Sequence, residues 1–336
     1  MKKKIFTDIA IMRPILIMCI VIGHAFTIYT NSTYWSLPIG CRSNLLLSWI
    51  NPTLISFALQ AFVFISGYLF AYKSQKKIDR KSFILSKLRR LYLPSILFSV
   101  LYILILHPER LKSWDVIYEI FSGAGHLWFL PMLFWCYVLG VFLPRIGRTK
   151  ILGSALILLL VSYMSFLVPN FLRLSNALHY FIYFCIGIYT FHFKDTIVTY
   201  VSTRKTIIPC AWFTIAFFCV LNLVLQNPQY NSLIYTIIKV SVNIVLGIIG
   251  SLCLYLTINL LLNKYTLLYK INYSNDIWFG MYIYHQFILI YIYYRTSIPV
   301  CLGNFSPFVA LLITIPSSLL LVKLTLKTNI GRWLIG

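Results

Sequence analysis

Two ionisable residues, Arg13 and His24, lie in the first strongly apolar segment of the chain. Ionisable side chains are costly in hydrocarbon, so inside a membrane span they are candidates for function by default. A helix places residues eleven apart on nearly the same face, because eleven steps make three turns plus about 20°, and separates them by roughly 16 Å along its axis. A histidine can take a proton from a hydroxyl nucleophile, and an arginine can bind an anion such as a phosphate.

Each of these residues also has a plainer interpretation. A lone membrane histidine can simply hydrogen bond to a neighbouring helix, and an arginine one turn inside the boundary can extend to the lipid headgroups. Pro14 frees a backbone carbonyl and permits a local kink. Asp8 lies five residues before Arg13, about 140° around the helix, so it is not an obvious partner.

A basic run precedes the third apolar segment and contains Lys87 and Arg90. These cations could hold a polyphosphate at the membrane surface. They could equally reflect the excess of Lys and Arg that is usual in cytoplasmic loops. Position alone leaves both interpretations open.

Four further residues are candidates for supporting roles. Trp128 suits an interfacial aromatic belt, and His126 beside it could face a carbohydrate or assist proton transfer. His285, near the middle of the ninth apolar segment, needs a hydrogen-bond partner, either structural or catalytic. Ser66 and Gly67 allow close helix approach, which favours a packing role.

The composition predicts a polytopic membrane protein. The 336 residues are 60% hydrophobic and only 11% charged, against about 25% charged in soluble domains. The formal charge of +22 comes from basic residues in short loops, which anionic lipid explains more simply than nucleic acid does. The sequence contains no CxxC motif, HExxH motif or carboxylate cluster, so it predicts no metal site.

Apolar segments of membrane-spanning length recur from end to end, and they predict an all-α transmembrane bundle of about ten spans. The predicted spans are Ile9–Tyr29, Leu54–Tyr72, Leu91–Leu106, Leu127–Leu143, Ile151–Val168, Leu178–Phe193, Ile207–Leu225, Ile234–Leu261, Ile277–Tyr294 and Phe308–Leu326. We expect residues 1–336 to form a single transmembrane domain with no appended soluble domain.

The distribution of Lys and Arg predicts the orientation. With the N-terminus inside, the inner segments hold 21 of these residues, the outer segments 5 and the spans 3. The positive-inside rule therefore predicts that both termini face the cytoplasm. Cys41 and Cys301 are then both on the outer side, and whether they pair stays open because spacing says nothing about proximity.

Four segments in this order resemble the acyltransferase 3 family of bacterial membrane acyltransferases. They are the first span with Arg13 and His24, FVFISGYLF at Phe62–Phe70, GHLWFLPMLFW at Gly125–Trp135, and MYIYHQFIL at Met281–Leu289. The resemblance covers nearly the whole chain. It implies a bacterial inner-membrane protein that moves an acyl group, usually acetyl, from cytoplasmic acyl-CoA to a glycan or other acceptor at the outer face.

The resemblance also implies roles for individual residues. His24 resembles the essential histidine that is proposed as the catalytic base, and Arg13 resembles the motif arginine that is thought to engage the acyl donor. Lys87 and Arg90 resemble a basic pair at the cytoplasmic mouth that is often two arginines. Lysine at the first position keeps the charge but loses the bidentate geometry.

We therefore expect an O-acetyltransferase that uses acetyl-CoA as a co-substrate, holds no bound cofactor, and modifies a surface polysaccharide or its lipid-linked precursor. The alternative is a polysaccharide or lipid transporter or flippase without acyl-transfer chemistry. Membrane lipids and the two substrates are the expected partners, and nucleic acid is not. The acceptor sugar, the choice between acetyl and succinyl, a covalent acyl-enzyme and the oligomeric state all stay open.

Overall fold

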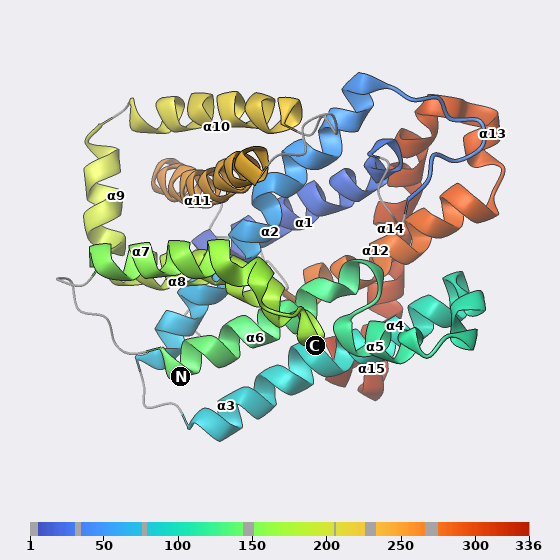
Figure 1. The fold of residues 1–336 in the computed structure, drawn as a ribbon, viewed down its shortest axis with the longest axis horizontal. Coiled ribbons are helices and arrows are strands. Elements are labelled where there is room, and N and C mark those ends of the chain that lie inside the picture. Colours follow the sequence, from blue (N-terminus) through green and yellow to red (C-terminus); the bar gives the residue numbers. More distant parts are fainter. Residues whose placement is uncertain are drawn as a thin grey trace. The chain divides into compact units, whose positions relative to one another are not determined.

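The computed structural model describes residues 6–30, 35–75, 79–143, 151–204, 206–225, 233–265 and 275–335. Within these ranges the regular elements are all helical, and there is no β-strand (Figure 1). The predicted all-α helical bundle is confirmed. The chain divides into two compact units, and the helices α2 (Leu45–Ser74) and α14 (Ser306–Lys327) each run from one unit into the other.

The first unit comprises Met1–Phe62 and Phe193–Leu324. Besides the start of α2 and most of α14, its helices are α1 (Thr7–Ala25), α9 (Lys194–Ser202), α10 (Ile207–Val224), α11 (Leu233–Lys264), α12 (Asn275–Arg295) and α13 (Ile298–Leu302). In this unit α1 packs against α11 and α12.

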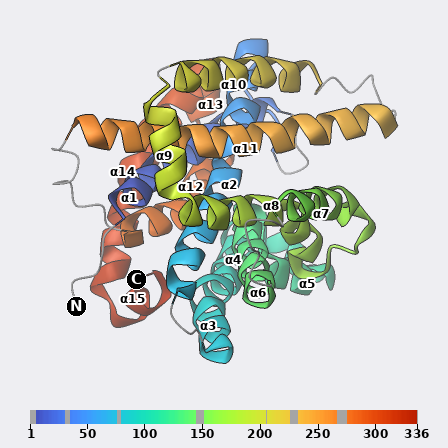
Figure 2. The ribbon, with the colours of Figure 1, turned by 90° about the vertical axis from the view of Figure 1, so that its left-hand side faces the viewer.

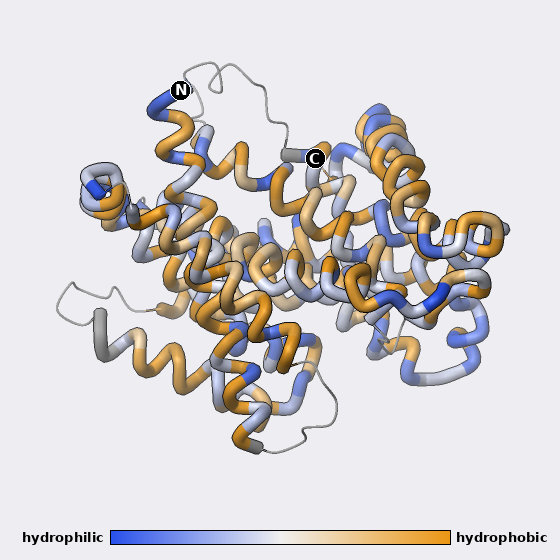
Figure 3. Tube along the Cα trace, turned by 90° about the horizontal axis from the view of Figure 1, so that it is seen from above, coloured by the Kyte–Doolittle hydropathy of each residue, from blue (hydrophilic) through white to orange (hydrophobic). Residues whose placement is uncertain are grey.

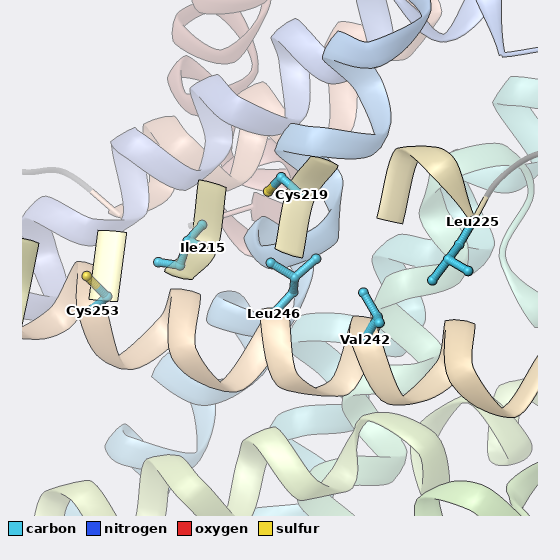
Figure 4. Close-up of a cluster of buried hydrophobic side chains, with 6 residues drawn as sticks. All are labelled: Ile215, Cys219, Leu225, Val242, Leu246 and Cys253. Atoms are coloured by element: carbon cyan, nitrogen blue, oxygen red, sulfur yellow. The ribbon is translucent and has the colours of Figure 1, made fainter. Parts of the chain in front are cut away.

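Helices α10 and α11 illustrate how these apolar sequences pack. The two helices pack side by side, and the longer α11 extends beyond α10 (Figure 2). Side chains from both helices meet in one buried cluster, which is drawn in Figure 4 and consists of Ile215, Cys219, Leu225, Val242, Leu246 and Cys253. Several large apolar side chains on other faces of α10 are exposed, as expected where a helix borders lipid.

The second unit comprises Val63–His192 and Thr325–Gly336. Besides the end of α2, its helices are α3 (Arg80–Lys87), the π-helical segment η2 (Leu88–Tyr92), α4 (Leu93–Leu106), α5 (Asp115–Ser122), the short 3-10 helix η4 (Gly125–Trp128), α6 (Phe129–Phe142), α7 (Ile151–Met164), α8 (Leu174–His192) and α15 (Asn329–Ile335).

A close backbone crossing joins α2 to α8 in this unit. A Cβ atom on Gly67 would overlap the carbonyl oxygen of Phe184, and a Cβ atom on Gly187 would overlap the carbonyl oxygen of Phe64. The contact is therefore reciprocal, with one glycine on each helix. Small residues allow membrane helices to approach this closely, because van der Waals packing drives their association.

The described residues contain eight helices that are long and apolar enough to cross a membrane. Hydrophobic residues recur along much of the helical trace (Figure 3). All ten predicted spans overlap helices. Two of these helices, α7 and α12, are not among the eight candidate membrane spans. The apolar part Ser154–Leu167 is short, and α12 carries His285, Gln286 and several tyrosines that lower its mean hydropathy.

Cys41 and Cys301 both carry free thiols. The Cys41 Sγ lies 3.3 Å from the carbonyl oxygen of Gly303 and 3.4 Å from the Ser306 Oγ. The structure therefore contains no disulfide between Cys41 and Cys301.

Candidate active site

The helix α1 carries both Arg13 and His24, and Pro14 lies within it without ending it. The two side chains are half-buried. As the sequence predicts, a continuous helix separates them by eleven residues, which corresponds to roughly 16 Å along its axis.

Asp8, in the first turn of α1, is bound by a residue that the sequence did not suggest. Asp8 is only 4% exposed, and its carboxylate lies 3.1 Å from the Nζ of Lys194 at the start of α9. Its other oxygen accepts a hydrogen bond from the backbone N–H of Ile9 at 2.9 Å. A buried carboxylate needs such partners, because removing it from water is costly without them.

The decisive contact lies near the other end of α1, where His24 meets His285 of α12. The Nδ1 of His24 and the Nε2 of His285 are 2.8 Å apart, which is hydrogen-bonding distance. His285 is fully buried, and its own Nδ1 lies 3.1 Å from the carbonyl oxygen of Met281, one helical turn earlier. Two histidines that are 261 residues apart in the sequence thus form one hydrogen-bonded pair.

The two imidazole rings are nearly coplanar. Their planes differ by 3° and their centres are 5.1 Å apart. The centre-to-centre distance exceeds the nitrogen–nitrogen distance by about the sum of the two ring radii, so the rings meet edge to edge. This geometry directs the hydrogen of one ring along the lone pair of the other, as a strong hydrogen bond requires.

The backbone around His24 is held by neighbouring side chains. The Nδ2 of Asn51 in α2 donates to the carbonyl oxygen of Gly23 and to the Oγ1 of Thr27, both at 2.8 Å. The Tyr293 hydroxyl of α12 donates to the carbonyl oxygen of Ala25. These contacts add side-chain hydrogen bonds from α2 and α12 to the last turn of α1, next to His24.

The predicted donor-binding pair, Lys87 and Arg90, lies in the second unit. Lys87 is the last residue of α3, and its Nζ lies 3.7 Å from the ring centre of Tyr137 and 5.4 Å from that of Phe83. Arg90 follows in the π-helical segment and is exposed. Such segments are rare, and they are frequent at functional sites.

The other candidates of the second unit occupy buried or half-buried positions. His126 is 4% exposed in η4, and its ring lies 6.4 Å from that of Tyr102. Trp128 is half-buried and packs edge to face on Tyr180 at 6.0 Å. Ser66 is buried in α2 beside the Gly67 crossing.

A family model described as an acyltransferase domain, that of the acyltransferase 3 family, matches residues 6–325. The chain belongs to the acyltransferase 3 family. The match in this acyltransferase runs from the residue before α1 to the last turn of α14, so it includes both units almost completely. Comparisons with curated proteins and with solved structures give no match.

The family and the apolar helices together make the protein a multi-pass membrane acyltransferase. Within the first unit of the acyltransferase, the structure brings together His24 and His285, which the sequence predicted separately. Sequence reasoning missed Asn51, Tyr293 and Lys194. An asparagine just before a predicted span and a lysine just after one are common, so neither Asn51 nor Lys194 was singled out by the sequence.

Proposed function

We propose that this membrane acyltransferase moves an acetyl group from cytoplasmic acetyl-CoA to a hydroxyl of a surface polysaccharide or of its lipid-linked precursor. The single observation that carries the proposal is the hydrogen bond between His24 and the buried His285, because it gives a membrane helix an oriented imidazole. We place the protein in the bacterial cytoplasmic membrane, with its acceptor on the outer side.

His24 acts as the general base in this proposal. Its imidazole takes the proton of the acceptor hydroxyl while the hydroxyl oxygen attacks the thioester carbonyl of the donor. The bond between that oxygen and the acyl carbon forms, and the carbon–sulfur bond breaks. The departing CoA thiolate takes the proton from His24, which restores the neutral imidazole and leaves an ester and free CoA.

The donor is bound by cations in this proposal. Lys87 and Arg90 bind phosphate groups of the CoA moiety, and their position in the basic segment before α4 supports this role. Arg13, the cation of α1, is the third donor-binding residue. We propose direct transfer to the acceptor, because no serine or cysteine in the sequence is recognisable as an activated nucleophile.

Transfer in a reconstituted system tests the proposal. The purified protein in liposomes is supplied with labelled acetyl-CoA. The acceptor is envelope glycan from a deletion strain that lacks this protein. We expect labelled glycan from the wild type and a loss of about 10²–10⁴-fold for His24→Ala, which is the usual contribution of a general base. His179→Gln is the matched control, because His179 is another half-buried histidine whose Nδ1 lies 3.2 Å from the Ser162 Oγ.

Two outcomes would overturn the proposal. Wild-type transfer by folded His24→Ala protein would remove His24 from the chemistry. Movement of the glycan across the membrane without any labelling would favour a transporter or flippase. Labelled succinyl-CoA, used in parallel, decides which acyl group is transferred, and mass spectrometry of the glycan identifies the acylated sugar.

A further inference from the structure

The proton positions in the histidine pair follow from one backbone carbonyl. A carbonyl oxygen only accepts hydrogen bonds, so the contact between the Nδ1 of His285 and the carbonyl of Met281 requires a hydrogen on that nitrogen. A neutral imidazole has one N–H, so the Nε2 of His285 carries a lone pair. That lone pair must accept from the Nδ1–H of His24, which lies 2.8 Å away.

We propose that His285 is a positioning residue that fixes His24 in the tautomer whose lone pair is on Nε2. This inference rests on the proposed role of His24 as the general base. In this arrangement His24 donates a hydrogen bond to His285, and His285 donates one to the backbone of α12. Either tautomer of an unpaired histidine is accessible, but only one of them satisfies both hydrogen bonds of this pair.

The pair also stabilises the charge that develops during the reaction. When the Nε2 of His24 takes the proton of the acceptor, His24 becomes an imidazolium whose Nδ1–H still donates to His285. The hydrogen bond is then charge-assisted, and such bonds are about twice as strong as neutral ones. An interaction that strengthens as the reaction proceeds accelerates the chemical step and leaves substrate binding unchanged.

A second imidazole suits this position better than a carboxylate would. His285 is 0% exposed, and a carboxylate there would be a permanent charge without solvent. A neutral imidazole orients the base without adding a charge to the resting protein. The anchor on Met281 lies within α12 itself, so the direction of the His285 ring is set by local helix geometry.

Two substitutions of His285 separate positioning from packing. His285→Leu replaces the imidazole with an apolar side chain of similar size, which offers no acceptor to His24. Its kcat for transfer from acetyl-CoA to the envelope glycan should fall about 10²-fold or more, because a base in the wrong tautomer loses most of its catalytic effect. The KM values should change less than about threefold. His285→Gln, whose Oε1 can accept near the position of the Nε2, should recover part of the kcat.

Nitrogen-15 NMR of histidine-labelled protein in liposomes measures the tautomer directly. In the wild type we expect the Nδ1 of His24 to be protonated and its Nε2 to be unprotonated. In His285→Leu we expect a mixture of both tautomers. His179→Gln serves as the matched control and should change neither the His24 signals nor the kcat.

The failure of this inference can be distinguished from failure of the proposed function. If His24→Ala is inactive while folded His285→Leu keeps the wild-type kcat, the positioning role is wrong and the catalytic base stands. A His24 that is protonated on Nε2 in the wild type would also overturn the inference. If His24→Ala keeps full activity, the proposed function itself is wrong.

Discussion

Lys87 is proposed to bind a phosphate of the donor, but in the structure it contacts an aromatic ring. Its ammonium group lies against the face of Tyr137, a cation–π contact that is worth about 0.5–1 kcal/mol where water is accessible. A side chain held in this way is partly ordered before any ligand binds. The contact could therefore serve the fold alone, or it could present the charge to a phosphate.

Replacement of Lys87 distinguishes these roles. We expect Lys87→Gln to raise the KM for acetyl-CoA about tenfold, which corresponds to about 1.4 kcal/mol, with little change in kcat. Lys81→Gln, an exposed lysine of the same helix, is the control and should leave the KM unchanged. An unchanged KM together with a lower melting temperature for Lys87→Gln would assign the residue to the fold alone.

Gly67 of α2 and Gly187 of α8 set how closely these two helices pack. Each glycine faces a backbone carbonyl of the other helix, and a backbone cannot move aside as a side chain can. The second-span segment FVFISGYLF therefore includes a packing contact at Gly67.

We expect Gly67→Ala to lower the stability of the protein by about 1–3 kcal/mol or more, because overpacking forces the helices apart. Thermal unfolding in detergent measures the effect. Gly140→Ala is the comparison: its Cβ would meet a ring atom of Phe184 at 2.8 Å instead of a backbone carbonyl, so we expect a smaller loss of stability than for Gly67→Ala. Equal melting temperatures for Gly67→Ala and the wild type would contradict the close crossing.

The number of spans is the question at the scale of the whole molecule. With ten spans, the start of α1 and the start of α9 both lie on the inner side. With eight, where α7 and α12 do not cross, α9 would lie on the outer side. The ion pair between Asp8 of α1 and Lys194 of α9 favours the ten-span arrangement, because it needs both residues on one side.

Labelling of Asp195→Cys tests this topology. We expect a membrane-impermeant maleimide to label this cysteine only after intact cells are permeabilised, whereas the exposed Cys301 is labelled from outside. Peptide mass spectrometry reads each site separately. Labelling of Asp195→Cys in intact cells would support eight spans and contradict the predicted orientation.

The sequence predicted the helices and the separation of Arg13 from His24, because hydrophobic length and helical rise are local properties. It did not predict that His24 binds His285, since the contact joins helices that are distant in the chain. The sequence did not predict that Lys194 pairs with Asp8 for the same reason. Helical spacing indicated that Arg13 is not an obvious partner of Asp8, but spacing within one helix could not identify Lys194 on another helix as the partner.

The π-helical turn at Leu88–Tyr92 changes the phase of the helix that it interrupts. Residues three apart lie close together on an α-helix, but a turn widened by about one residue rotates the remainder of the helix by about 100°. Lys87 turns toward Tyr137, while Arg90 is exposed. In the proposed donor site the two cations would therefore bind as separate charges instead of one clamp, which suits a donor with phosphates at two positions.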